Sequence, residues 1–260
     1  MSVKHQLEKT IWRSDVYYQM AKKGSQDNGH PGMVLLKSIA KKSEKILDFG
    51  CGEGTRLNWA AQHKKESLGL DISQKGIELA RKKYPKLNFK KADLEKVPLK
   101  DESFDLVYSA YVLEHLQSPE KVLKEALRLL KPNGYLLLIA PNYGAPNRCS
   151  PPFKGSRQKK LIRGFINDFA KQDQLNWNKV TPISTNGKYD VDWDTTIEPY
   201  IGSLINFLKY HNFKIIQANS CWSQELPNAK PHQKLFRFLG EKSIYPFKYW
   251  GPHLVVLAKN

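Results

Sequence analysis

Lys45-Ile-Leu-Asp-Phe-Gly-Cys-Gly-Glu-Gly-Thr55 is the stretch around which the rest of this 260-residue chain is arranged. Its first part, residues 46–49, is mostly apolar without regular alternation, which is typical of a parallel strand covered on both faces. Glycines follow at every second position from Gly50 to Gly54, and residues 57–62 favour the first turns of a helix. A strand, a glycine turn and a helix bring backbone N–H groups close to a ligand, so this stretch predicts a binding turn.

Several classes of nucleotide-binding protein share such a turn. The fingerprint of nicotinamide and flavin dinucleotides has a third glycine or alanine at position 55, where this chain has Thr55. Asp48 precedes the turn and is not part of that fingerprint. The spacing therefore disfavours a dinucleotide site, while a glycine-rich turn without any ligand remains as the alternative.

Carboxylates recur where successive strands are expected to end. Residues 67–72 favour a second strand that ends near Asp71, about 20 residues past the glycine turn, where a carboxylate accepts hydrogen bonds from ribose hydroxyls. Residues 87–90 favour a third strand, and Asp93 follows it. Each aspartate alone could be a turn or cap residue. Together with Asp48 they indicate a nucleoside ligand, because open α/β sheets bind at that edge.

Further strands and helices alternate along the chain. Residues 104–108 and 135–140 favour a fourth and a fifth strand, and Ser118 begins a helix between them. Residues 1–44 favour an N-terminal helical cap with one or two helices over residues 7–20. Its aromatic residues could form a lid over the ligand or pack the helix on the core, and packing is favoured; they are Trp12, Tyr17 and Tyr18.

Composition and charge set outer bounds. No apolar run reaches the length of a membrane span, and the N-terminus lacks an apolar signal region. The three cysteines are scattered and the seven histidines show no paired ligand spacing, so we expect a cytoplasmic protein without a metal. The net charge of +17 is spread over both halves of the chain. It indicates an anionic partner such as RNA or a membrane surface, or a lysine-rich solvated surface, and the latter is favoured.

The motifs taken together resemble a class I S-adenosylmethionine-dependent methyltransferase over residues 45–142. The similarity is greatest to the subgroup that includes the ubiquinone and menaquinone biosynthesis methyltransferases (methyltransferase type 11). The segments that carry it are Ile46-Leu-Asp-Phe-Gly-Cys-Gly-Glu-Gly54, Gly69-Leu-Asp-Ile-Ser73, Ala92-Asp-Leu94, Phe104-Asp-Leu-Val-Tyr-Ser-Ala-Tyr-Val-Leu-Glu-His-Leu116 and Leu130-Lys-Pro-Asn-Gly-Tyr-Leu136.

This resemblance implies a Rossmann-like α/β sandwich with a seven-stranded, mostly parallel sheet and an antiparallel seventh strand. It also implies S-adenosyl-L-methionine as the cofactor. The loop from Asp48 to Gly54 would hold the methionine part, with Gly50 and Gly52 in closest contact and Cys51 among the binding residues. Asp71 would bind the ribose, Ile72 would flank the adenine, Asp93 and Leu94 would meet its edge, and Ser109 would line the site.

A sulfonium makes its methyl group electrophilic, so the protein mainly has to hold a nucleophile in line with the S–CH₃ bond and exclude water. A hydroxyl acceptor would profit from a general base, and His115, one turn past the fourth strand, is the candidate. A structural or water-binding role for His115 is the alternative.

Two long insertions interrupt the expected core. Residues 143–196 are too long for a plain connection, and we interpret them as a substrate lid that includes a helix over residues 161–169. Residues 197–260 complete the same domain with a helix and strands six and seven, and carry a second insertion at 222–250.

We therefore expect a methyltransferase that acts on an O, N or C nucleophile of a small-molecule, lipid-precursor or glycan-precursor acceptor. The alternatives are an RNA or protein methyltransferase that uses the basic surface, and a non-catalytic S-adenosylmethionine-binding protein.

Overall fold

The structure is a computed structural model of the chain. It describes residues 7, 11–25, 27–62, 66–170, 173–183, 189–222 and 229–260. The basic pair at 64–65 and parts of both expected insertions lie outside the described residues.

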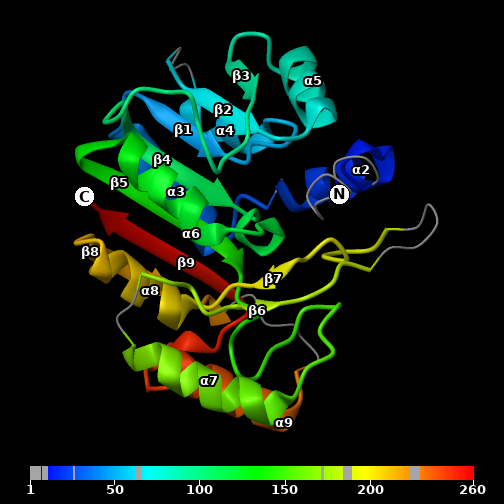
Figure 1. Ribbon diagram of the computed structural model, residues 1–260, viewed down its shortest axis with the longest axis vertical. Coiled ribbons are helices and arrows are strands. Elements are labelled where there is room, and N and C mark those ends of the chain that lie inside the picture. Colours follow the sequence, from blue (N-terminus) through cyan, green and yellow to red (C-terminus); the bar gives the residue numbers. More distant parts are fainter. Residues whose placement is uncertain are drawn as a thin grey trace.

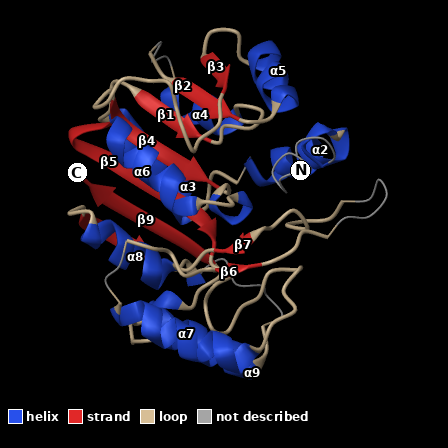
Figure 2. Ribbon diagram, in the orientation of Figure 1, coloured by secondary structure: helices blue, strands red, loops and turns tan. Residues whose placement is uncertain are grey.

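A seven-stranded sheet forms the centre of the molecule, as expected (Figures 1 and 2). Its order is β3-β2-β1-β4-β5-β9-β8. The first five strands in that order are parallel, and β9 runs antiparallel to both of its neighbours. The strands are β1 (Ile46–Phe49), β2 (Leu68–Asp71), β3 (Asn88–Lys91), β4 (Phe104–Ala110), β5 (Leu130–Pro141), β8 (Lys214–Asn219) and β9 (His253–Lys259).

Two buried apolar clusters cover the two faces of this sheet. One includes side chains of α3, α4 and α5, and the other includes side chains of α6 and α8. Residues of β1 alternate between the clusters, with Ile46 in the first and Leu47 in the second, as the twofold side-chain period of a strand requires. The helices are α3 (Pro31–Lys41), α4 (Thr55–Ala61), α5 (Gln74–Lys83), α6 (Pro119–Leu129) and α8 (Ile201–Tyr210). The chain is thus a three-layer sandwich around one sheet.

The largest differences from the expected element boundaries occur in three places. Over residues 7–20, where one or two helices were expected, the structure has a 3₁₀ turn, η1 (Ile11–Arg13), followed by α2 (Asp15–Ser25), which extends past the expected end. The fifth strand begins at Leu130, because the expected turn is taken up within the strand by Asn133 at φ 65°. The lid helix, α7 (Arg157–Phe169), begins four residues earlier than expected because Ser156 accepts a hydrogen bond from Lys159 N–H as its N-cap.

The two insertions add peripheral elements. The first contains α7 and β6 (Asn178–Lys179), and β6 pairs with β7 (Ile197–Glu198) directly after this insertion. The second contains α9 (Pro231–Glu241) and η4 (Phe247–Tyr249). In Figure 1, α7 and α9 lie at the lower end of the molecule, and α7 packs against α8, where Asn206 Nδ2 donates to Asn167 O at 2.8 Å. No helix among the described residues is long and apolar enough to cross a membrane.

Candidate active site

A cavity of about 410 Å³ opens at the carboxyl ends of β1, β2 and β4. The sheet order reverses between β1 and β4, and open α/β sheets bind their ligands at such a reversal. Three parts of the chain line the cavity: the glycine turn with the strand ends, the N-terminal elements η1 and α2, and the segment around Tyr189 and Asp192 from the first insertion.

The glycine turn forms the floor of this cavity, and only glycine suits two of its positions. Gly50 has φ 96°, and a Cβ there would lie 2.3 Å from Val112 Cγ2. Gly52 has φ 51° and lines the cavity, and a Cβ there would meet no atom within 4 Å. The side chain of any other residue at position 52 would therefore occupy space that the cavity offers to a ligand.

Asp71 is fixed against this turn by backbone donors. Its carboxylate accepts the N–H of Gly52 and the N–H of Ser73, each at 2.8 Å. Burial raises the pKa of Asp71, while these two hydrogen bonds lower it. Asp71 thus joins the end of β2 to the glycine turn and presents its carboxylate to the cavity.

Of the ten candidate residues, eight line the cavity and two do not. Those that do are Gly50, Cys51, Gly52, Asp71, Ile72, Asp93, Leu94 and His115. Asp48 does not line it. Strand alternation points its side chain to the face of the sheet opposite Leu47 and Phe49, and on that face Tyr108 OH donates to it at 2.6 Å. Ser109 is also buried behind the cavity wall and donates to Phe49 O at 2.8 Å.

Asp48 carries a prediction about stability. Burial raises its pKa to about 7, although the hydrogen bond from Tyr108 lowers it. A carboxyl group with a higher pKa in the folded than in the unfolded state stabilises the fold while the group is protonated. This contribution to the free energy of unfolding is lost as the pH rises toward 7. We expect Asp48→Asn to raise the free energy of unfolding at pH 8 by on the order of 2 kcal/mol, with a smaller change at pH 5.

Thermal unfolding of both proteins at the two pH values measures this effect. Asp105→Asn is the matched control. Partial burial raises the pKa of Asp105, but Lys131 and backbone N–H groups lower it below its ordinary value. Removing this carboxylate should therefore not stabilise the protein at pH 8. An equal or lower melting temperature of Asp48→Asn at pH 8 would contradict the assignment.

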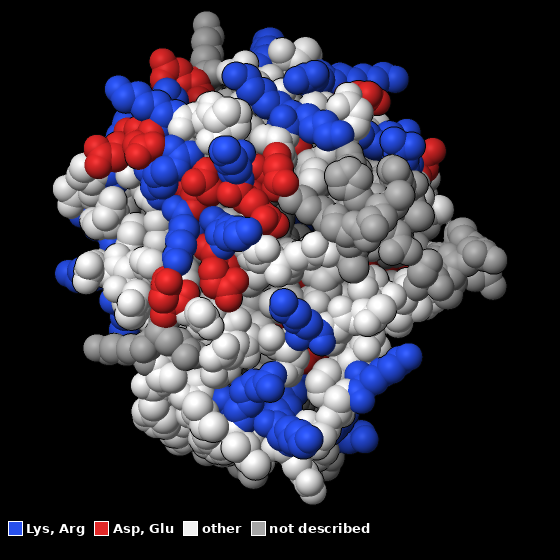
Figure 3. All heavy atoms as spheres, viewed as in Figure 1, with Lys and Arg blue, Asp and Glu red and all other residues white. Residues whose placement is uncertain are grey.

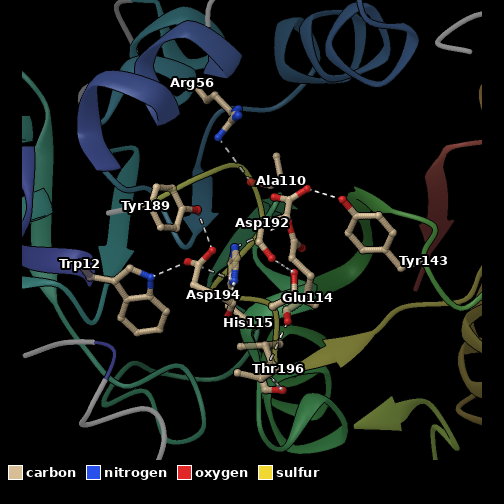
Figure 4. A network of polar contacts seen from close by, with 12 residues as sticks. Trp12, Arg56, Ala110, Glu114, His115, Tyr143, Tyr189, Asp192, Asp194 and Thr196 are labelled. Carbon is tan, nitrogen blue, oxygen red and sulfur yellow. Dashed lines mark hydrogen bonds and ion pairs between the residues drawn. The ribbon is translucent and has the colours of Figure 1, made fainter. Parts of the chain in front are cut away.

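The second end of the cavity is built on η2 (Leu113–His115) (Figure 4). His115 Nδ1 lies 3.4 Å from Asp194 Oδ2, and His115 Nε2 lies 3.7 Å from Glu114 Oε1. Asp194 also accepts hydrogen bonds from Trp12 Nε1 at 2.9 Å and from Tyr189 OH at 2.7 Å. One buried carboxylate therefore ties the N-terminal region, η2 and the first insertion together beside the cavity.

Opposite charges control the protonation of this cluster. Burial lowers the pKa of His115, but Asp194, Glu114 and Asp192 raise it to about 9. Burial raises the pKa of Glu114 to about 7, while His115 lowers it. At neutral pH His115 is therefore an imidazolium, and Glu114 exchanges its proton in the physiological range.

Glu114 has an oxygen without a partner. Its side chain is buried and lines the cavity, and Oε2 has no hydrogen-bond partner among the described residues. Buried carboxylate oxygens usually have a hydrogen-bond donor, and an N–H or O–H group of a water or ligand in the cavity would supply one to this atom.

Acidic side chains dominate the charged groups of the cavity wall in a chain of net charge +17. Its Asp and Glu residues outnumber the one arginine, Arg56, and they are Asp27, Glu53, Asp71, Asp93, Glu95, Glu114 and Asp192. Such a wall favours ligands that carry positive charge.

Sequence reasoning missed several of these residues. Glu114 stands beside His115 in the motif used above, but only burial distinguishes its carboxylate from an exposed one. Arg56 carried no signal in the sequence, and Asp192 was included only as part of the expected lid. The N-terminal aromatic residues both pack on the core and lie over the cavity. Trp12 and Tyr18 are buried, and together with Tyr17 they line the cavity.

Residues 47–138 match the family described as "Methyltransferase domain". The chain is 33% identical over 111 residues to a probable S-adenosylmethionine-dependent methyltransferase of Mycolicibacterium smegmatis, covering 42% of this chain and 43% of that protein. It is 26% identical over 181 residues to a malonyl-[acyl-carrier protein] O-methyltransferase of Marinomonas, covering 66% of this chain and 67% of that protein.

The fold has relatives among solved structures. An S-adenosylmethionine-dependent methyltransferase from Mesorhizobium loti superposes with a TM-score of 0.55 at 20% identity, over 90% of this chain and 99% of that one. The Mycolicibacterium relative, by contrast, is matched over less than half of its length. Among the described residues no group of three or more His, Cys, Asp or Glu side chains could hold a metal ion.

Proposed function

We propose that this chain, which carries a class I S-adenosylmethionine-dependent methyltransferase domain, transfers a methyl group to a small acceptor that contains an amine. The observation that carries the proposal is the cavity itself. It joins the glycine turn and Asp71 at one end to an unpartnered buried oxygen of Glu114 at the other.

S-Adenosylmethionine, when bound, supplies an electrophilic methyl group on a sulfonium. The open space above Gly52 and the adjacent carboxylate of Asp71 suit its methionine and ribose parts. We assign the adenine to the wall formed by Ile72, Asp93 and Leu94. Asp48 and Ser109 then support this site from behind without touching the cofactor.

Arg56 is a further candidate for the cofactor end. Its guanidinium lines the cavity above the ring of Tyr111 at 4.9 Å, and its buried Nε has no hydrogen-bond partner among the described residues. A planar guanidinium is well suited to a carboxylate, so we assign it to the carboxylate of the cofactor.

We assign the role of general base to Glu114 and a positioning role to His115. An ammonium must lose a proton before its nitrogen can attack, and a carboxylate with a pKa near 7 accepts protons efficiently at neutral pH. His115 as an imidazolium cannot accept a proton; it holds Glu114 and Asp194 in place by opposite charge. The earlier prediction of His115 as the base is replaced in this proposal.

The acidic wall favours a small cationic or neutral acceptor over a nucleic acid. An RNA acceptor would bring phosphates toward the carboxylates of Glu114 and Asp192, which is electrostatically unfavourable. Among the described residues that line the cavity, Arg56 is the one Lys or Arg side chain, and it is assigned to the cofactor and not to RNA. We assign the role of a lid over the acceptor end, proposed for the first insertion, to the segment around Tyr189 and Asp192, which lines the cavity.

Three narrower predictions stay as proposals. They are membership of the quinone-biosynthesis subgroup, a cytoplasmic location, and the division into a helical cap (1–44), a core (45–142), a lid (143–196) and a C-terminal part (197–260).

Methyl transfer from labelled S-adenosylmethionine tests the proposal. The full chain is incubated separately with a panel of primary and secondary amines, with phenols and with total RNA, and S-adenosylhomocysteine is quantified. We expect turnover with members of the amine panel. Turnover confined to phenols would refute the amine assignment, and turnover confined to RNA would refute the small-acceptor assignment as well.

A further inference from the structure

Helix α7 presents its apolar residues to solvent and buries the polar residues Lys160 and Asn167. Lys160, Gly164 and Asn167 are buried at helical spacing, on the side that faces the protein. The opposite side carries the exposed apolar residues, with exposed fractions of 40% for Leu161, 62% for Ile162, 38% for Phe165, 61% for Ile166 and 74% for Phe169. These five residues form one continuous stripe, which we call the α7 apolar face.

Specific contacts fix this orientation. Lys160 Nζ lies 2.7 Å from Glu198 Oε2, and both side chains are buried. A Cβ on Gly164 would lie 2.5 Å from Pro146 Cγ, so the helix packs closely only on its glycine side. Rotating the helix to bury its apolar face would break the buried ion pair, which is strongly unfavourable. The outward apolar face is therefore a fixed property of the fold.

Aromatic and basic residues extend this face. The ring of Tyr245 lies 5.7 Å from that of Phe169 and 6.4 Å from that of Phe165, between ring centroids. Residues 154–163 contain no acidic side chain, and four exposed cations stand in that stretch: Lys154, Arg157, Lys159 and Arg163. Figure 3 shows blue Lys and Arg atoms beside white ones in the lower part of the molecule, where α7 lies in Figure 1.

We propose that the α7 apolar face docks on the surface of an anionic lipid bilayer. The apolar side chains would enter the boundary between head groups and acyl chains, and the flanking cations would meet the lipid phosphates. Large exposed apolar stripes on a protein surface mark interaction sites, and the basic flank selects an anionic partner. This surface has no part in the methyl-transfer proposal and does not depend on it.

Charge decides between a bilayer and a second copy of the chain. A symmetric dimer through this face would bring Lys159 and Arg163 of both copies into one interface, because the same patch serves both partners. Like charges there would repel. An anionic bilayer has the complementary charge, so it is the partner that the face fits.

Flotation of the full chain with lipid vesicles tests the proposal. Vesicles of phosphatidylcholine alone are compared with vesicles of equal parts phosphatidylcholine and phosphatidylglycerol. We expect binding to the anionic vesicles that weakens with added salt. Ile166→Asp should lower the partition coefficient about tenfold, through lost apolar insertion and added negative charge. Lys159→Glu should lower it at least about fivefold.

Val34→Asp is the matched control, because Val34 is 56% exposed on α3 and the substitution changes the charge equally. It should bind like the wild type. The proposal is overturned if no vesicle binds the wild type, if Ile166→Asp and Val34→Asp bind alike, or if neutral vesicles bind as well as anionic ones. A dimer in light scattering that Ile166→Asp dissociates would also overturn it and assign the face to a second copy.

Discussion

Glu114→Gln is expected to lower kcat for an amine acceptor about 10²–10⁴-fold, the range typical of a lost general base. The amide keeps the size of the side chain and cannot accept the proton. The side chain is buried, so its isosteric replacement changes packing little. Stopped assays of S-adenosylhomocysteine formation at saturating cofactor measure the effect, and thermal unfolding shows that the variant is folded.

The pH profile separates a base from a merely structural residue. Glu114 accepts a proton only when ionised, so kcat/KM of the wild type should rise with pH through about 7. It should fall again as His115 loses its proton near pH 9. Glu114→Gln should lose the rising limb. A variant with reduced kcat and an unchanged rising limb would assign the base to another group.

Asp71→Ala is expected to weaken the binding of S-adenosylmethionine about 100-fold or more, because hydrogen bonds to a charged group contribute about 1.5–3 kcal/mol each. The substitution removes the acceptor proposed for the ribose. It also releases the N–H groups of Gly52 and Ser73, which hold the glycine turn in its shape. Calorimetric titration of the wild type and the variant gives the ratio of dissociation constants.

Asp105→Ala is the control for this variant. Asp105 likewise accepts two backbone hydrogen bonds, from Glu44 N–H at 3.1 Å and Lys45 N–H at 2.8 Å, but at the opposite end of the sheet. Its loss should affect stability and leave the affinity for the cofactor unchanged. Equal affinities of Asp71→Ala and the wild type would remove Asp71 from the site.

The sheet was predictable because its signals are local. The apolar run at 46–49, the glycine turn and the later apolar runs identify the strands, and parallel strands place their carboxyl ends at one edge. Asp71 and Asp93 were expected from that edge, from the spacing between the glycine turn and Asp71, and from the family resemblance. A motif does not reveal to which face of a short buried strand a polar side chain points. Asp48 was therefore expected at the cavity, whereas its side chain packs behind the cavity wall against Tyr108.

The acceptor end could not be predicted in the same way. Its properties come from residues far apart in the sequence, since Asp194 joins Trp12 and His115 across more than 75 positions. The pKa values of His115 and Glu114 depend on this assembly and on burial, neither of which a motif contains. The outward apolar face of α7 could not be predicted for a similar reason, because the buried ion pair of Lys160 is made with Glu198, 38 positions along the chain.

Calorimetric titration of the wild-type chain with S-adenosylhomocysteine and, separately, with NADH tests the central claim most directly. The account predicts saturable one-to-one binding of S-adenosylhomocysteine in the micromolar range and no binding of NADH. Absence of binding by S-adenosylhomocysteine to the folded protein, or preferential binding of NADH, would contradict the assignment of the cavity to a methyl-donor cofactor.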